Sequence, residues 1–382
     1  MKDFTHAAAA LRLHHGSTAL ERLAKDIDRA GFSRALLITG RTLGAGGAVL
    51  EAVQAALGGR IVSVWSGVMP HSPLPTVLAA AQELAAVRAD AVVALGGGSA
   101  VVTARAAAIA LADGPDLRRL ATHRDATGRL RSPRLNAPKL AQFVIPTTPS
   151  TAAVKAGSAV LDPDSGARLA LFDPKTRAAS VALDPQALRA APAALITDAA
   201  LNSLTLAIEG VLSPGVDPFA EAFLLNAIRM IRVAIDGHAA GLAEGAPELA
   251  VAAALAGRGT DHAGAGVATV LSHALGARFG LGHGGLNAIL LPAALRFNAA
   301  HAPQALELVA QAMGCADAQA LIADLTGLPA RLGLPGRLAD LGISETALSQ
   351  AAAWALDDWF LAGNPRPVTD AAELEAILQA TY

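Results

Sequence analysis

The first part of the chain alternates short apolar runs with segments whose apolar residues recur at helical spacing. The runs ALLIT (35–39), IVSVWSG (61–67) and DAVVALGGGS (90–99) are compact enough for strands. Between them, GAVLEAVQAAL and LPTVLAAAQELAAVRA repeat their apolar residues every three or four positions, as amphipathic helices do. Strands that alternate with helices of this length predict parallel βαβ units in an α/β domain.

The pattern changes twice further along the chain. The segments FVIPTTPSTAAVKAGSAVLD and ARLALFDPKTRAASVALDP predict an antiparallel excursion that closes the first domain, with Asp184-Pro185 as a natural break. Beyond Gln186 helical spacing continues almost to Tyr382, interrupted by Gly and Pro. We therefore predict an α/β dinucleotide-binding domain over residues 1–185 and an all-helical domain over residues 186–382.

Composition narrows the possible partners. The 382 residues are 53% hydrophobic and 16% charged, and a net charge of −2 without a long run of one sign gives little support to nucleic-acid or membrane-surface binding. A single cysteine, Cys315, excludes an intrachain disulfide and fits a reducing compartment. The N-terminus lacks a secretion signal, and apolar stretches end well short of the ~20 residues of a membrane span. The composition predicts a cytoplasmic enzyme with a small-molecule substrate.

For three polar segments of the chain we favour a structural role over a functional one. The basic, Pro-containing segment 116–140 is read as a solvated excursion, with a lid or phosphate clamp as the alternative. His14-His15 is expected to lie at a strand edge rather than to bind a ligand. Asp357 and Asp358 look like the polar face of an amphipathic helix.

The stretch GGGS (96–99) is the first motif along the chain that indicates a binding function. It follows an apolar strand and opens the helix AVVTARAAAIAL, so that glycines and a helix N-terminus would together accept a pyrophosphate. This predicts a dinucleotide site, the alternative being a turn that is glycine-rich for packing only. Gly40-Arg41 ends the first strand, where an acidic side chain would bind the adenosine ribose hydroxyls. Glycine and a cation there predict that NADPH is tolerated as well as NADH, although a plain turn with a surface Arg fits equally.

The order of five motifs resembles the iron-containing alcohol dehydrogenase superfamily over essentially the whole chain. These motifs are GGGS (96–99), IPTT (145–148), LDP (183–185), AIEG (207–210) and SHALGARFGLGHGGLNAILLP (272–292). The two ends of the chain look like the maleylacetate reductase branch. The resemblance implies a Rossmann-like nucleotide-binding domain, an all-helical domain in the dehydroquinate synthase-like arrangement, a reaction cleft between the two domains, and a homodimer.

Carried over by position, the resemblance assigns residues to the cofactor. The implied pyrophosphate-binding residues are Gly96, Gly97, Gly98 and Ser99. The residues implied along the adenine-ribose and nicotinamide path are Thr147, Thr148 and Thr151, with Arg168 where the family often has a cofactor-contacting lysine.

The family's metal ligands are mostly replaced. An Asp and three His hold the metal in the family, and the corresponding positions here are Asn202, Leu206, Thr269 and His283. Leucine has no lone pair, Thr and Asn are feeble ligands, and one imidazole does not hold Fe²⁺ or Zn²⁺. We therefore predict no catalytic metal. Maleylacetate reductases resemble this chain in the Asn and are regarded as metal-independent, but they usually retain the two histidines lost here.

Without a metal, other groups must stabilise a developing oxyanion. His273, which matches a family histidine near the nicotinamide, and His283 are the candidate donors, and Asn202 would add an amide N–H. The alternative for His273 is a hydrogen bond within a helical core. Lys155, in a small apolar stretch, would pair with a substrate carboxylate or donate a proton, or would simply reach solvent.

The sequence thus predicts a metal-independent NAD(P)H-dependent reductase of a small activated carbonyl or enone, which carries a carboxylate. It is similar to maleylacetate reductase, the aromatic-catabolism enzyme that converts maleylacetate to 3-oxoadipate. One alternative is a reductase or alcohol dehydrogenase for a different ketone or aldehyde in a biosynthetic pathway. The other is a non-catalytic nucleotide-binding relative with a decayed site.

Overall fold

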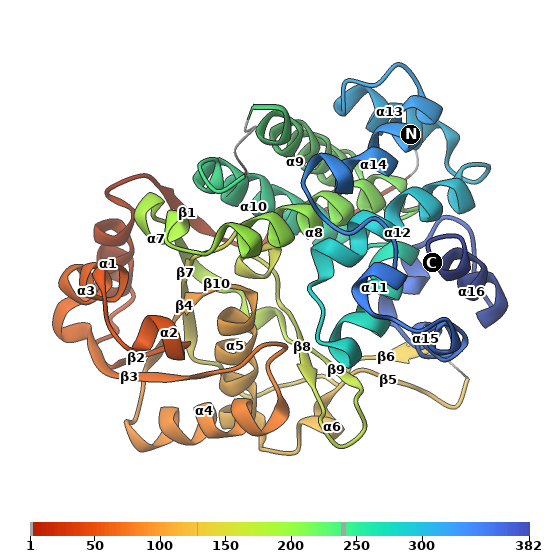
Figure 1. Cartoon of the computed structure of the whole chain (residues 1–382). Helices are drawn as coiled ribbons and strands as arrows, with labels where there is room; N and C mark the ends of the chain where they lie inside the picture. Colours follow the sequence, from red (N-terminus) through yellow and green to blue (C-terminus); the bar gives the residue numbers. More distant parts are fainter. Residues whose placement is uncertain (1–2, 128, 238–241) are drawn as a thin grey trace. The chain divides into compact units, whose positions relative to one another are not determined.

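The structure, a computed structural model, describes residues 3–127, 129–237 and 242–382 (Figure 1). The chain forms two compact units. One unit comprises Ala9–Pro192 and contains the strands. The other comprises Ala193–Tyr382 together with the N-terminal residues through Ala8, and its described elements are helical.

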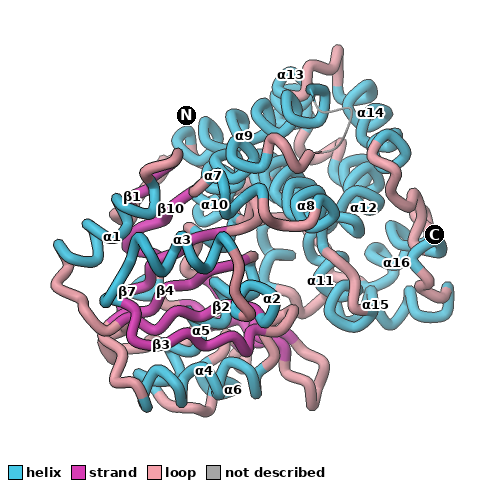
Figure 2. The backbone as a smooth tube through the Cα atoms, turned by 60° about the vertical axis from the view of Figure 1, so that its left-hand side comes forward, coloured by secondary structure: helices cyan, strands magenta, loops and turns pink. Residues whose placement is uncertain are grey.

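A six-stranded, wholly parallel sheet forms the centre of the first unit (Figure 2). Its spatial order is β1-β10-β7-β4-β2-β3. The strands are β1 (Arg12–His15), β2 (Ala35–Gly40), β3 (Ile61–Val68), β4 (Ala91–Gly96), β7 (Ala141–Pro146) and β10 (Ala178–Leu183). The predicted parallel βαβ units are confirmed, and His14-His15 lies on the edge strand β1 as expected.

The predicted antiparallel excursion is correct only for its middle. β8 (Gly157–Leu161) and β9 (Arg168–Phe172) form an antiparallel hairpin, whereas the flanking strands β7 and β10 are parallel members of the main sheet. Val144 and Val181 are fully buried, as the residues of a strand covered on both faces must be. The continuous apolar runs FVI and SVAL were the local sign of that double burial.

Helices cover both faces of this sheet. On one face α1 (Ala19–Arg29) and α3 (Ala48–Leu57) pack against β2, β4 and β7 through a cluster that includes Leu23, Val53, Leu37 and Phe143. On the other face lie α4 (Leu74–Ala86) and α5 (Gly98–Asp113), which pack against each other (Figure 2). The unit also contains the short helices α2 (Arg41–Gly44), α6 (Leu117–Leu120) and α7 (Pro185–Arg189).

The helical unit is built around the buried helix α8 (Ala193–Leu212), which contacts α9, α10 and α12. α8 is long and apolar enough to span a membrane by composition, but 72% of its apolar window is buried within the fold, as in the core helix of a globular protein. The surrounding helices are α9 (Pro218–Gly237), α10 (Ala246–Ala263), α11 (Val267–Phe279), α12 (His283–Asn298), α13 (Pro303–Ala312), α14 (Ala318–Arg331), α15 (Leu348–Ala355) and α16 (Ala371–Gln379).

Glycines permit this close packing. A Cβ at Gly210 of α8 would lie 2.9 Å from the Leu224 side chain of α9, and one at Gly259 of α10 would lie 2.5 Å from the same side chain. Any larger residue at either position would push the three helices apart.

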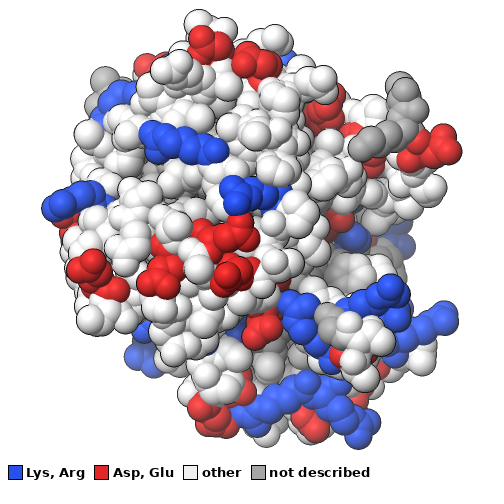
Figure 3. Space-filling model, turned by 90° about the vertical axis from the view of Figure 1, so that its right-hand side faces the viewer, with Lys and Arg blue, Asp and Glu red and all other residues white. Residues whose placement is uncertain are grey.

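The basic segment 116–140 is anchored at both ends. Arg118 forms an ion pair with Asp162 at 2.7 Å, and the fully buried Lys139 side chain forms ion pairs with Asp113 at 2.6 Å and Asp173 at 3.0 Å. Between these anchors lies a small hairpin of β5 (His123–Arg124) and β6 (Leu130–Arg131), whose arginines are exposed, as the solvated reading expects. On the face drawn in Figure 3, Lys and Arg gather in the lower part, and charges of both signs are scattered over the remainder.

Candidate active site

The strand order points to a ligand site at the carboxyl ends of the parallel strands. The connection from β2 leads to β3 on one side, whereas β4 lies on the other side of β2 and is followed by β7. α/β sheets bind ligands beyond the carboxyl ends of the strands at such a reversal. Gly40 ends β2, and Gly96 and Pro146 end the neighbouring strands level with each other. The sheet therefore places Gly40-Arg41, the glycine loop and Thr147-Thr148 at the carboxyl ends of its strands.

The glycine loop is shaped by close contacts that a side chain would block. Gly96 has φ of +142°, a conformation that favours glycine. A Cβ at Gly97 would lie 3.2 Å from Thr148 Oγ1, and one at Gly98 would lie 3.0 Å from Ser150 Oγ. Gly97 is the N-cap of α5 and offers no side-chain cap. The first N–H groups of α5 therefore have no side-chain cap and are suited to a phosphate.

A buried arginine that the sequence reasoning missed supports the loop beside these glycines. Arg105 of α5 is fully buried and donates from Nη1 to the Gly157 carbonyl at 2.6 Å and from Nη2 to the Ala152 carbonyl at 2.7 Å. It thereby fixes the loop that contains the buried Thr151 and the partly exposed Lys155. A lone cation in the apolar helix AVVTARAAAIAL was the available signal, since a buried Arg must find acceptors.

Arg168 begins β9, opposite Leu161 of the hairpin. Thr147 and Thr148 are buried, with 6% and 8% of their surface exposed, and the Thr147 N–H donates to the Gly96 carbonyl at 3.1 Å. The predicted cofactor residues on β2, β4, β7 and α5 therefore lie at the carboxyl ends of neighbouring strands, whereas Arg168 belongs to the hairpin.

In the helical unit, the Glu209 side chain of the AIEG motif caps helix α11. It is buried and accepts hydrogen bonds from the backbone N–H groups of Gly266, Ala268 and Thr269, at 3.0, 2.7 and 3.2 Å. The Thr269 hydroxyl donates to it at 2.6 Å. Burial raises the pKa of Glu209, and these hydrogen bonds oppose that rise. The carboxylate connects α8 rigidly to the helix that carries His273.

The residues at the four metal-ligand positions do not fit an iron ion. Asn202 Oδ1 accepts a hydrogen bond from Asn287 Nδ2 at 3.0 Å, and the Thr269 hydroxyl is already bonded to Glu209. Leu206 is a buried hydrocarbon, and His283 Nδ1 lies 3.1 Å from Ser272 Oγ. A single imidazole among these neighbours does not form an octahedral or tetrahedral ligand set.

His273 and His283, the two candidate donors, lie close together. Their ring centroids lie 5.3 Å apart in an edge-to-face arrangement. His273 also packs against the rings of Trp359 and Phe360 in the 3₁₀ helix η6 (Trp359–Gly363). Asn202 is linked through Asn287 to α12, the helix that His283 begins. Of the four predicted catalytic residues, three thus lie in the helical unit and Lys155 lies in the other.

The reading of Asp357 and Asp358 as the polar face of a helix is wrong. α15 ends at Ala355, and Asp358 lies beyond it with only 8% of its side chain exposed. Asp358 Oδ2 is 2.7 Å from His273 Nδ1, while its Oδ1 accepts the Phe360 N–H. A proton on His273 Nδ1 donated to the Asp358 carboxylate would fix the orientation of the imidazole ring. The two residues are 85 positions apart, so spacing gave no sign of the pair.

A second missed residue explains the glycines of HGGLN. Asp198 of α8 accepts the Gly285 N–H at 2.9 Å, and a Cβ at Gly284 would lie 1.8 Å from the Asp198 carbonyl oxygen. α8 therefore lies directly against the first turn of α12, which only glycine allows. This contact positions His283 at the N-terminus of that helix.

Arg366 contacts other residues of the helical unit. Its guanidinium lies 3.9 Å from the centroid of the Phe297 ring and pairs with Glu373.

Comparison with known proteins covers both units. Residues 10–185 match the family described as iron-containing alcohol dehydrogenase, and residues 196–382 match the C-terminal part of the Fe-containing alcohol dehydrogenase family. Lactaldehyde reductase of Escherichia coli is 30% identical over 369 residues, covering 93% of this chain and 94% of the relative. Maleylacetate reductase of Burkholderia cepacia is 29% identical over 384 residues, covering 100% and 98%. A crystal structure of 1,3-propanediol oxidoreductase superposes with a TM-score of 0.88 at 25% identity, covering 98% of each chain.

Proposed function

This chain belongs to the iron-containing alcohol dehydrogenase family and is an oxidoreductase of the NAD-dependent type, and on that premise we propose that it is a metal-independent reductase of a small activated carbonyl or enone. The observation that carries the proposal is the state of the four ligand positions. Asn202 and Thr269 are committed to other side chains, and Leu206 has no donor atom. A reaction without a Lewis acid then needs hydrogen-bond donors at the reacting oxygen.

The proposed cofactor site lies at the carboxyl ends of the parallel strands. Gly96–Ser99 and the N-terminus of α5 hold the pyrophosphate, and Thr147, Thr148 and Thr151 line the rest of the path, with Arg168 as a further contact. The exposed Arg41 after β2 favours tolerance of a 2′-phosphate, because a cation there attracts the anion that an acidic residue would repel. We therefore propose that both NADPH and NADH bind. When bound, the cofactor supplies the hydride.

The helical unit supplies the donors. In its doubly protonated form, His273 donates Nδ1–H to Asp358 and supplies the Nε2 proton to the substrate oxygen, and the His283 ring lies beside it. Asn202 uses its Oδ1 for Asn287, which leaves its amide N–H groups as donors. An enone suits this set, because hydride addition to its C=C bond places negative charge on an enolate oxygen that two donors can stabilise.

The substrate class is proposed from Lys155 and from the relatives. A lysine beside the cofactor loop suits a substrate carboxylate, and maleylacetate reductase is among the similar proteins. A second candidate is the reduction of an uncharged aldehyde or ketone, which the similarity to lactaldehyde reductase favours. We propose further that the enzyme is a cytoplasmic homodimer.

A chelator-treated sample tests the proposal. We expect NAD(P)H oxidation with maleylacetate or a related keto acid to proceed at the same rate before and after chelation. Lactaldehyde serves as the uncharged comparison substrate, and its preferred turnover would establish the second candidate. Loss of activity on chelation, restored by Fe²⁺, would overturn the metal-independent mechanism. Failure of NADPH and NADH to bind would establish the decayed-site alternative.

A further inference from the structure

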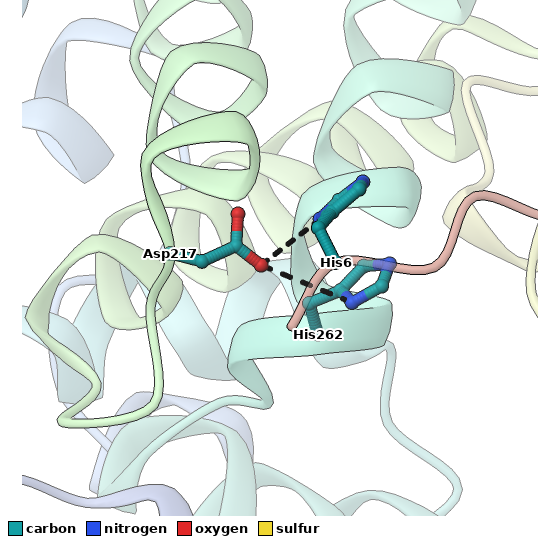
Figure 4. Close-up of side chains that lie close together, drawn as sticks. All are labelled: His6, Asp217 and His262. Carbon is teal, nitrogen blue, oxygen red and sulfur yellow. Dashed lines mark hydrogen bonds and ion pairs between the residues drawn. The ribbon is translucent and has the colours of Figure 1, made fainter. Parts of the chain in front are cut away.

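Three side chains far apart in the sequence converge away from the residues described above (Figure 4). His6 lies in the N-terminal segment, Asp217 directly precedes α9, and His262 lies in the last turn of α10. His6 Nδ1 is 2.9 Å from Asp217 Oδ2, and His262 Nδ1 is 4.0 Å from the same oxygen. Within the described residues, these three form a group whose possible ligand atoms all lie within 4.8 Å of one another.

The imidazole rings of His6 and His262 are stacked, and both direct Nδ1 toward Asp217. The His6 and His262 rings are 4.1 Å apart between centroids and inclined by 24°, and the Phe219 ring stacks against His6 at 4.9 Å. Both histidines direct a nitrogen toward one carboxylate oxygen, as the dashed lines in Figure 4 show. Packing therefore holds both Nδ1 atoms close to Asp217 Oδ2.

The carboxylate is fixed by a separate set of contacts. Asp217 Oδ1 accepts the backbone N–H groups of Phe219 and Ala220, both at 2.9 Å, and so caps α9. This bonding leaves Oδ2 facing the imidazoles. The exposed fraction of the side chain is 11% for His6, 6% for Asp217 and 22% for His262. A ligand oriented in this way by its neighbours loses little freedom when it binds an ion.

We propose that His6, Asp217 and His262 form a binding site for a divalent transition-metal ion of the Zn²⁺ class. A tetrahedral ion with bonds of about 2.0–2.1 Å holds its ligand atoms about 3.3 Å apart. The 2.9 and 4.0 Å separations bracket that value, so small side-chain rotations suffice. Two imidazole nitrogens and one carboxylate oxygen are a common ligand set for Zn²⁺.

The surroundings leave room for the remaining coordination position. Asp217 and His262 line a cavity of about 650 Å³, which admits water or a small anion as the fourth ligand. Burial lowers the pKa of His262, and the nearby His6 lowers it further, which favours the neutral imidazole that binds metal. A bound ion would join the N-terminal segment to α9 and α10, and the site shares no residue with the proposed reaction site.

Titration of the full-length, chelator-treated protein with Zn²⁺ tests this site. We expect calorimetry to show one ion per chain, and atomic emission to find that ion after desalting. His6→Ala and His262→Ala should each weaken Zn²⁺ binding at least about tenfold, since each removes one of three ligands. His301→Ala is the matched control: it also lines the cavity, but it lies outside the converging group, and its affinity should equal that of the wild type.

One further variant separates loss of a metal ligand from loss of folding. Asp217→Asn retains an oxygen to cap α9 but lacks the anionic ligand, so it should fold normally and still lose affinity. Absence of Zn²⁺ binding by the wild type would overturn the proposal. Equal binding by His6→Ala and the wild type, or loss of binding only in His273→Ala, would also overturn it. None of these readouts uses turnover, so failure of the reductase proposal leaves them unaffected.

Discussion

The helical unit contains two clusters with the same composition, two histidines and one aspartate, and opposite geometry. In the first, His273 Nδ1 bonds to Asp358 while His283 Nδ1 bonds to Ser272, and the rings meet edge to face. In the second, His6 and His262 are stacked and both direct Nδ1 toward one oxygen of Asp217.

Residue types therefore do not decide the chemistry of such a cluster. Where each imidazole has its own hydrogen-bond partner, the ring nitrogens do not share an acceptor, and a protonated ring is suited to donate a proton. Where the nitrogens converge on a shared carboxylate, the same groups are suited to a cation. The positions of the two carboxylates set this difference. Asp358 caps η6 and contacts only His273 of its cluster, whereas Asp217 caps α9 with Oδ1 and directs Oδ2 toward both His6 and His262.

The largest effect is expected when the proposed proton donor of the first cluster is removed. We expect His273→Ala to lower kcat by about 100-fold or more, because general acid catalysis contributes about 10²–10⁴-fold. Cofactor affinity, measured by calorimetry, should stay within error of the wild type. His301→Ala, an exposed histidine of the same unit, should retain full kcat. A His273→Ala enzyme that turns over normally would place the donor role elsewhere.

Removing the carboxylate that anchors the first cluster should cost stability. Glu209→Ala leaves three backbone N–H groups and the Thr269 hydroxyl without their buried acceptor. We expect the free energy of unfolding in urea to fall by about 3 kcal/mol. Thr269→Val, which removes only one of these bonds, should cost about 1 kcal/mol. The exposed Glu345→Ala is the control and should change stability by less than about 0.5 kcal/mol.

The positioning role of Asp358 gives a smaller effect. Asp358→Asn keeps the cap of η6 but removes the charge beside His273. We expect kcat to fall by about tenfold, with KM nearly unchanged and the His273 limb of the pH–rate profile shifted to lower pH. Asp357→Asn, an adjacent exposed residue, should leave both the rate and the profile unchanged. Identical profiles for Asp358→Asn and the wild type would limit Asp358 to a purely structural contact.

The smallest expected effect concerns acid stability of the second cluster. Burial works to raise the pKa of Asp217, but the hydrogen bonds from His6 and from the α9 backbone outweigh it and lower that pKa. A lowered folded-state pKa stabilises the fold above the ordinary Asp pKa, and that contribution is lost as pH falls through the folded value. Wild type should therefore lose more unfolding free energy than Asp217→Asn on going from pH 5 to pH 2. Equal losses would contradict the shift.

The sequence by itself determined the main features of the fold. The alternation of apolar runs and helical spacing predicted the parallel sheet, because both depend only on local periodicity. GGGS was located correctly at a strand-to-helix turn, since the need for glycine there is local too. The family resemblance placed Asn202, Leu206 and Thr269 at metal-ligand positions, and the residue types there could be read directly; that the chain works without a metal stays a prediction.

Only the tertiary structure decided the partners of the functional side chains. Asp358 is 85 residues from His273, and Asp217 is 211 residues from His6, distances at which spacing carries no information. The same limit hid the contacts of Arg105 with the 151–157 loop, and it led to β7 and β10 being placed in an antiparallel excursion. Hydrogen bonds between distant elements depend on how helices and strands pack, and that packing is a property of the whole fold rather than of any one segment.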